Sequence, residues 1–149
     1  MSVLRKILLA SLGVGLSGAA LAFDCTIKFV KDSCWGGYSV TLQAIDAKTL
    51  QPMDLKVSLA KDQFAVRQHY RCKPGQSFTF RAQFEPTIWA NQKGKIYHAR
   101  PAWTVPQRLA QGEVSWDVPV CFMKNFASVP LPPTSTGHCK CDFSPLDKK

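Results

Sequence analysis

The residues best suited to chemistry in this chain are a histidine and two cysteines close together near the C-terminus. His138, Cys139 and Cys141 carry the nitrogen and sulfur donors that bind zinc in proteins, and Cys25 and Cys34 could complete a set of ligands. The spacing His-Cys-x-Cys is tighter than the two-residue gaps of structural zinc sites. In an oxidising compartment these cysteines form disulfides instead. The sequence therefore predicts no metal site and no cofactor.

Arrangements that could support catalysis are incomplete. Glu85, Glu113 and Asp117 are the carboxylates that could form a glycosidase pair, but their spacing does not place two of them on one face. The chain has no Gly-x-Ser-x-Gly motif and no phosphate-binding glycine loop. Cysteine catalysis needs a free thiol, and an even number of cysteines leaves none. We therefore expect a protein that is not an enzyme and has no catalytic residues. A small hydrolase remains the alternative if a pocket joins Glu85 or Asp117 to His98 or His69.

Aromatic and basic residues are the candidates for binding. Trp89 and Trp103 lie beside loops and prolines, whereas Trp116 alternates with valines and is expected in the core. Large aromatic side chains with nearby positive charge are typical of contact surfaces. The predicted partner-binding residues are Trp89, Trp103, Tyr97, Lys93, Lys95 and Arg100. Packing of the tryptophans in the core is the alternative.

The chain is basic, with a formal net charge of +9. Such a charge favours acidic partners, here a cell-envelope protein or an acidic glycan or lipid surface. The lysines and arginines are scattered along the sequence, so plain solubility explains the charge equally well. No nucleic-acid-binding motif is present, and we expect no nucleic acid as partner.

The N-terminal segment has the three parts of a secretory signal peptide. Arg5 and Lys6 are followed by an apolar run from Ile7, and small residues end it at Ala20 to Ala22. We expect residues 1–22 to be cleaved after Ala22, which places the protein in the periplasm or outside the cell. A retained membrane anchor is the alternative, but glycines and serines interrupt a stretch already short for a bilayer. No later apolar run is long enough to span one.

All six cysteines follow the predicted cleavage point, so we expect three disulfides. The sequence admits fifteen ways of pairing them. Cys139 and Cys141 are separated by one residue, and a bond between them would need a strained ring. We expect these two to pair with Cys25 and Cys34, which leaves Cys72 paired with Cys121.

Apolar and polar residues alternate with the period of a half-buried β-strand over most of the remaining chain. The clearest case follows the Lys-Pro-Gly-Gln turn at residues 73–76, where Phe78, Phe80, Ala82 and Phe84 share one face. The other predicted strands are residues 25–30, 38–44, 55–59, 63–72, 95–99 and 114–120. A single helical turn is predicted within residues 105–112.

Residues 40–59, VTLQAIDAKTLQPMDLKVSL, resemble the opening hairpin of CnaB-like and carboxypeptidase-regulatory β-sandwich modules. The similarity lies in a strand that ends in Asp46-Ala47 and leads through Thr49 to Pro52. Leu50 stands where those modules usually have a glycine. The resemblance implies a β-sandwich architecture and carries no function with it.

These patterns predict an all-β protein, an immunoglobulin-like antiparallel β-sandwich stapled by disulfides. Residues 23–127 would form the sandwich, and the proline-rich residues 128–149 would be a tail tied to it. We expect a non-enzymatic exported protein of the bacterial cell envelope or of a secretion assembly, acting through protein–protein contacts. A carbohydrate- or peptidoglycan-binding module is the alternative.

Overall fold

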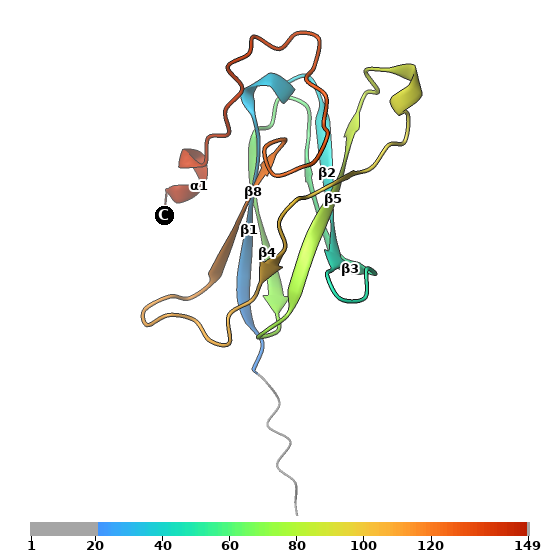
Figure 1. Ribbon diagram of the computed structural model, residues 1–149. Helices are drawn as coiled ribbons and strands as arrows, with labels where there is room; N and C mark the ends of the chain where they lie inside the picture. Colours follow the sequence, from blue (N-terminus) through green and yellow to red (C-terminus); the bar gives the residue numbers. More distant parts are fainter. Residues whose placement is uncertain (1–20, 149) are drawn as a thin grey trace, which may run out of the picture.

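The computed structural model describes residues 21–148 of the protein, and strands account for most of its regular structure (Figure 1). A three-stranded sheet contains β1 (Phe23–Lys31), β4 (Ala65–Cys72) and β8 (Trp116–Phe122). A five-stranded sheet contains β2 (Ser39–Asp46), β3 (Pro52–Leu59), β5 (Ser77–Glu85), β6 (Tyr97–His98) and β7 (Trp103–Thr104). The helical segments are short: η1 (Ser33–Trp35), η2 (Ala90–Gln92) and α1 (Ser144–Asp147). The predicted all-β class is confirmed.

The order of the strands within each sheet cannot be read from the sequence. β1 lies at the centre of the three-stranded sheet, antiparallel to β4 and parallel to β8. The five-stranded sheet has the order β3-β2-β5-β6. β7 pairs with the same edge of β5 as β6 does, nearer the start of β5. Pro119 lies within β8, where a residue without an N–H is tolerated because β8 is an edge strand. The sequence predicted antiparallel sheets. The parallel β1–β8 pair shows that this prediction is wrong for the three-stranded sheet.

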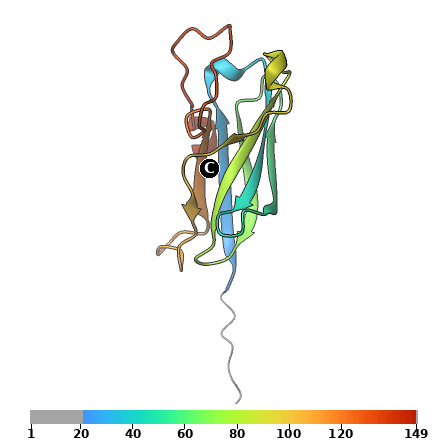
Figure 2. The ribbon, with the colours of Figure 1, turned by 45° about the vertical axis from the view of Figure 1, so that its right-hand side comes forward.

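The core lies between the inner faces of the two sheets. Its members alternate along the strands, which is why period two identifies them. From the three-stranded sheet come Ile27, Phe29, Val118 and Val120, and from the five-stranded sheet Val40, Leu42, Phe78, Phe80 and Ala82, all of them buried. Figure 2 shows the two layers side by side. The predicted inward faces of β2, β3 and β5 are therefore confirmed.

Residues 40–59 form a hairpin of β2 and β3. The two strands pair antiparallel, with a register shift between Gln43 and Ile45. Asp46 closes the turn, since its carboxylate accepts hydrogen bonds from the backbone N–H groups of Lys48 and Thr49, each at 2.9 Å. Leu50 has a φ of 59°, a left-handed conformation that favours glycine.

Three disulfides join the six cysteines, all of which lie within the described residues. The bonds are Cys25–Cys72, Cys34–Cys139 and Cys121–Cys141, with Cα–Cα distances of 5.9, 5.3 and 6.0 Å. Cys139 and Cys141 bond to different partners, as predicted. Two of the three disulfides hold the C-terminal segment against the body.

The predicted Cys72–Cys121 bond and the predicted bond of Cys25 to the tail are both wrong, and strand order gives the reason. Cys72 is on β4 and Cys121 on β8, which lie on opposite sides of β1. In the β1–β4 register, Cys72 is opposite Phe23 and Cys25 is opposite Tyr70, so the two cysteines are diagonal neighbours on one face. Cys121 instead meets Cys141, which the tail brings to the end of β8.

Two local predictions between β7 and β8 are wrong. Residues 105–112 form no helical turn, because the backbone of Val105 continues the pairing of β7 and exchanges hydrogen bonds with Gly75 and Gln76. Val114 is not part of a strand either: β8 begins at Trp116, and Val114 is 86% exposed. Trp116 is half-buried and packs against the core, in line with its predicted place.

The predicted signal peptide falls almost entirely on residues 1–20, which lie outside the described residues. Among the residues that are described, no helix is long and apolar enough to cross a membrane. The disulfides indicate an oxidising environment, such as the periplasm or the extracellular space.

Candidate functional site

The outer face of the three-stranded sheet is occupied by the chain's own C-terminus. Leu146 of α1 is buried, and Asp147 accepts a hydrogen bond from Lys28 of β1 at 3.1 Å. Lys28 also pairs with Asp117 of β8 at 2.8 Å, and these two ion pairs raise the pKa of Lys28. In Figures 1 and 2, α1 lies beside this sheet, away from β2, β3 and β5. The helix covers part of this face, and Arg67, His69 and Arg71 of β4 remain exposed.

The outer face of the five-stranded sheet is polar and open. Residues that alternate with the core point outward from its strands, and they are mostly hydroxyls, amides and cations. They are Ser39, Thr41 and Gln43 of β2, Asp54, Lys56 and Ser58 of β3, and Ser77, Thr79, Arg81, Gln83 and Glu85 of β5. Strands β2 and β5 position them because their other faces are anchored by buried phenylalanine, leucine and valine side chains.

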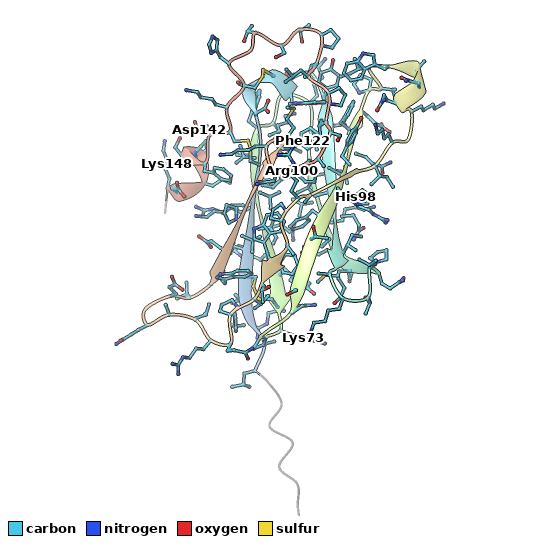
Figure 3. All side chains as sticks on the ribbon, in the orientation of Figure 1. Lys73, His98, Arg100, Phe122, Asp142 and Lys148 are labelled. Atoms are coloured by element: carbon cyan, nitrogen blue, oxygen red, sulfur yellow. A yellow bond between two sulfur atoms is a disulfide. The ribbon has the colours of Figure 1, made fainter. Side chains whose placement is uncertain are left out.

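Strand register places three basic side chains in one line across this face. Lys56 is opposite Gln43, Gln43 is opposite Arg81, and Arg81 is opposite His98 of β6. We call Lys56, Arg81 and His98 the basic row. Neighbouring strands lie about 4.8 Å apart, so Lys56 and Arg81 stand about 10 Å apart along the row. Figure 3 shows His98 beside β5, on the side of the molecule away from Lys148.

A groove lies next to the basic row, between the sheet and the loop that follows η2. Its volume is about 490 Å³, and a smaller hollow of about 100 Å³ adjoins it over Gln43 and Arg81. The residues lining this sheet groove are Ser39, Thr41, Lys56, Gln83, Phe84, Glu85, Thr87 and residues 92–95. Lys93 and Lys95 thus face the same space as Lys56.

The loop wall of the sheet groove is fixed by specific contacts. The Tyr97 hydroxyl donates to the side-chain oxygen of Gln92 at 2.7 Å, and the Gln83 amide donates to the carbonyl of Gly94 at 3.3 Å. The ammonium of Lys95 lies 5.3 Å from the centre of the Tyr97 ring, within the range of a cation–π contact. These contacts hold both lysines of the loop near the sheet.

The cations of this face have no acidic partner within residues 21–148. The ion pairs there join Lys28 to Asp117 and Asp147, and Arg71 to Asp24, all on the other sheet or α1. Lys56, Arg81, Lys93 and Lys95 take part in none of them. Glu85 is the one carboxylate among the residues that line the sheet groove. The electrostatic potential of the groove is therefore positive.

The structure divides the predicted partner-binding residues among three places. Lys93 and Lys95 line the sheet groove. Tyr97 is only 2% exposed, its ring stacks on Phe84 at 5.7 Å, and burial raises its pKa. Its role is therefore to support the groove from beneath.

The remaining three predicted residues lie outside the sheet groove. Trp103 is half-buried and packs edge-on against Phe80 at 5.3 Å. Trp89 is half-buried at the start of η2. The backbone N–H of Arg100 donates to the carbonyl of Asn125 at 2.8 Å, which ties that segment to the loop after β8. The two tryptophans and Arg100 do not form one platform with the lysines.

Sequence reasoning missed Lys56 and Arg81. Both occupy outward positions of predicted strands, so their exposure could be read from the alternation. Their proximity depends on β2 lying between β3 and β5, and no sequence signal gives that order.

The four cysteines considered for a metal site, Cys25, Cys34, Cys139 and Cys141, are all in disulfides, and Asp32 lies beside one of these bonds. Asp32, Cys34 and Cys139 bring oxygen and sulfur atoms within 4.8 Å of one another, but the two sulfurs are bonded together. The carboxylate of Asp32 instead accepts hydrogen bonds from the backbone N–H groups of Cys34 at 3.0 Å and Met123 at 3.4 Å. Burial raises the pKa of Asp32. Its role is to cap η1 and hold the start of the loop after β8.

A hollow of about 260 Å³ joins Asp117 and His69, the pair that a hydrolase would require. The carboxylate of Asp117 is engaged by Lys28 at 2.8 Å. The imidazole of His69 contacts the Thr26 hydroxyl at 3.3 Å, and that hydroxyl is 2.8 Å from the hydroxyl of Ser115. These are cross-strand contacts, with no carboxylate orienting the imidazole as in a catalytic triad.

Comparisons with known proteins provide no relative for this chain. No protein-family model matches it, and searches of curated proteins and of solved structures find no match. Its function must therefore be inferred from the geometry of the molecule.

Proposed function

We propose that this chain is an exported, non-enzymatic binding protein of the cell envelope, and that its sheet groove holds an acidic partner. The two sheets would form an immunoglobulin-like sandwich that serves as a rigid support. Residues 1–22 would direct export as a signal peptide, which agrees with the oxidising environment that the disulfides indicate.

One observation carries the proposal: four cations surround the sheet groove and none of them has an acidic partner within residues 21–148. Side chains of one charge repel one another, so this arrangement lowers stability unless a partner supplies the opposite charge. On the other sheet, Lys28 and Arg71 are neutralised by nearby carboxylates. Other cations, such as Arg67 of β4, also have no acidic partner within residues 21–148, so the distinguishing feature of the five-stranded sheet is that four cations gather around one groove.

The proposed contact surface lies on the five-stranded sheet, not at the tryptophans that the sequence indicated. Binding is favoured over catalysis because the groove holds a single carboxylate and no nucleophile–base pair. An acidic partner would be attracted over a distance of about 10 Å at moderate salt and then held by direct ion pairs.

The test is binding to a general polyanion, dextran sulfate, with uncharged dextran as the reference. Replacing Lys56 and Arg81 together by glutamine should weaken binding about tenfold, since each lost ion pair contributes somewhat less than 1 kcal/mol. Affinities are to be measured by biolayer interferometry at low and moderate salt.

The matched control replaces Lys73 and Lys124 by glutamine, which removes the same charge elsewhere. Lys73 lies in the turn between β4 and β5, at the far end of β5 from Glu85, and Lys124 follows β8. The control should change the affinity less than twofold. Equal losses in both variants would show that net charge alone governs binding, and the proposal would be wrong.

A further inference from the structure

We infer that the acidic partner of the sheet groove is a polysaccharide that carries carboxylate groups and crosses the strands along the basic row. This inference rests on the function proposed above and specifies the chemistry of its ligand. It follows from the spacing of the cations, from the polar groups between them and from the scarcity of exposed apolar side chains on this face.

The spacing of the cations favours a polymeric ligand over a small anion. Lys56 and Arg81 point outward from strands that are two positions apart, about 10 Å, and His98 extends the row by one more strand. Lys93 and Lys95 add charge along the groove beside the row. One small anion cannot reach cations so far apart, whereas a polymer with an acidic group on successive units can.

The groups between the cations suit sugar hydroxyls. The hydroxyls of Thr41 and Ser58 lie 2.9 Å apart and each can still donate or accept another hydrogen bond. Gln43 donates to the carbonyl of Met53 at 2.6 Å, which fixes the amide and leaves its side-chain oxygen as an acceptor. A sugar ring presents donors and acceptors around its rim, so such a mixed polar surface matches it.

The same face lacks what an acidic protein partner would need. Protein interfaces centre on buried aromatic and aliphatic anchors, and lysine is depleted at their cores. Among the described large hydrophobic residues, only Ile96 lines the hollows of this face and is exposed, at 38%. Phe84 lines the groove but is partly buried, and Tyr97, which stacks on it, is buried. A single small apolar contact suits one face of a sugar ring better than a protein surface.

The groove is also held in shape before binding. The contacts of Gln92 with Tyr97 and of Gln83 with Gly94 fix the loop wall, and β2 and β5 fix the floor. Little ordering is therefore required when the ligand binds, which limits the entropic cost. Glu85 stands at one end of the groove, opposite Ser39, and disfavours an acidic group there. The carboxylates should therefore lie toward Lys56 and Arg81.

The experiment measures binding of octagalacturonate by isothermal titration calorimetry to the mature chain with its disulfides intact. Two further probes are matched to it: the methyl-esterified oligosaccharide, which has the same sugar chain without charge, and octaglutamate, which has the same charge on a peptide. We expect octagalacturonate to bind at least tenfold more tightly than either one.

Two variants locate the binding site. Lys56→Gln with Arg81→Gln should weaken octagalacturonate binding about tenfold, whereas Lys73→Gln with Lys124→Gln should change it less than twofold. Thermal unfolding of each variant should match that of the parent, because the three lysines are exposed and Arg81 is only partly buried. Equal loss in both variants would overturn the assignment to the sheet groove.

The outcomes separate this inference from the proposed function. If octaglutamate binds as tightly as octagalacturonate and loses affinity in the groove variant, the polysaccharide is wrong but the acidic partner stands. If the esterified chain binds as tightly as the acid, charge is not recognised and both are wrong. Absence of binding by both acidic probes also overturns both.

Discussion

Leu50 shows at the scale of one residue how the β2–β3 turn is made. It adopts a φ of 59° at the end of the turn, and its side chain is 71% exposed. The left-handed conformation costs a residue with a Cβ about 1–2 kcal/mol relative to a right-handed one. Hydrogen bonds hold it there, since Leu50 donates from its backbone N–H to the carbonyl of Asp46 at 2.9 Å. The turn therefore keeps a strained residue in place.

Leu50→Gly should raise the stability of the protein. Glycine removes the steric cost at positive φ, and part of that gain is lost to the greater freedom of the unfolded chain. We expect a net gain of about 1 kcal/mol and a rise in Tm of about 3 °C, measured by urea and thermal unfolding.

Leu131→Gly serves as its control, because Leu131 is also exposed, at 49%, and is not among the residues with positive φ. Here glycine should lower stability by about 0.5–1 kcal/mol. If both glycine variants changed the free energy of unfolding by the same amount in the same direction, the turn conformation would not be the source of the effect.

The predicted binding residues show that burial of a single side chain could not be read from the sequence. Lys93 and Lys95 were predicted as binding residues from composition and position, and both line the sheet groove. Trp103 was predicted as a binding residue because it lies beside prolines, and Tyr97 as another aromatic ring, yet both rings pack on phenylalanines of β5. Position within a loop or near a proline does not determine burial, which depends on what lies across the sheet.

At the scale of the elements, alternation identified the strands well. The faces of β2, β3 and β5 could be assigned because each has at least three apolar residues at period two. Short strands such as β6 and β7 have only two residues each, too few for a period to appear. Partners and register remained undetermined, because no residue type encodes which strand lies beside another.

The C-terminal helix α1 is an element that depends on docking. It has four residues, too few for stability alone, and Leu146 supplies its buried contact. Asp147 and Lys28 add an ion pair that is partly open to solvent. The helix therefore exists because the sheet gives its apolar side chain a place to pack.

Leu146→Ala should release α1 from the three-stranded sheet. Truncating the side chain removes most of the apolar contact, so residues 144–147 should exchange their backbone hydrogens about tenfold faster. Hydrogen exchange followed by mass spectrometry would measure this, with β2 and β5 unchanged. Leu131→Ala, in the exposed part of the tail, is the matched control and should leave the exchange of residues 144–147 as it was. Unchanged exchange in the Leu146 variant would show that the ion pair and the nearby disulfide suffice to hold α1.

At the scale of the whole molecule, the disulfides determine how the tail is attached. Cys34–Cys139 and Cys121–Cys141 close loops of very different length, with sequence separations of 105 and 20 residues. In the chain-entropy model a longer loop restricts the unfolded chain more. The sequence predicted six paired cysteines correctly, but which ones meet depends on strand order.

Removing each bond by a double serine substitution should therefore give unequal losses. Without Cys34–Cys139 the free energy of unfolding should fall by about 5 kcal/mol, and without Cys121–Cys141 by about 3 kcal/mol. Urea denaturation of the two double variants would measure both values, and neither variant has a free thiol. The reverse order would show that local packing of the tail, rather than loop closure, accounts for the stabilisation.

The position of β1 has a consequence for how the molecule is assembled. β1 is the first strand of the described chain, yet its neighbours β4 and β8 are the fourth and the last. A polypeptide delivered across a membrane from its N-terminus would therefore emerge with its opening strand unpaired. One edge of β1 could pair with β4 once residue 72 had emerged, but the other edge would stay unpaired until residue 122 had emerged. Such long-range pairing slows folding, so the chain would complete its smaller sheet only after nearly all of it had been released.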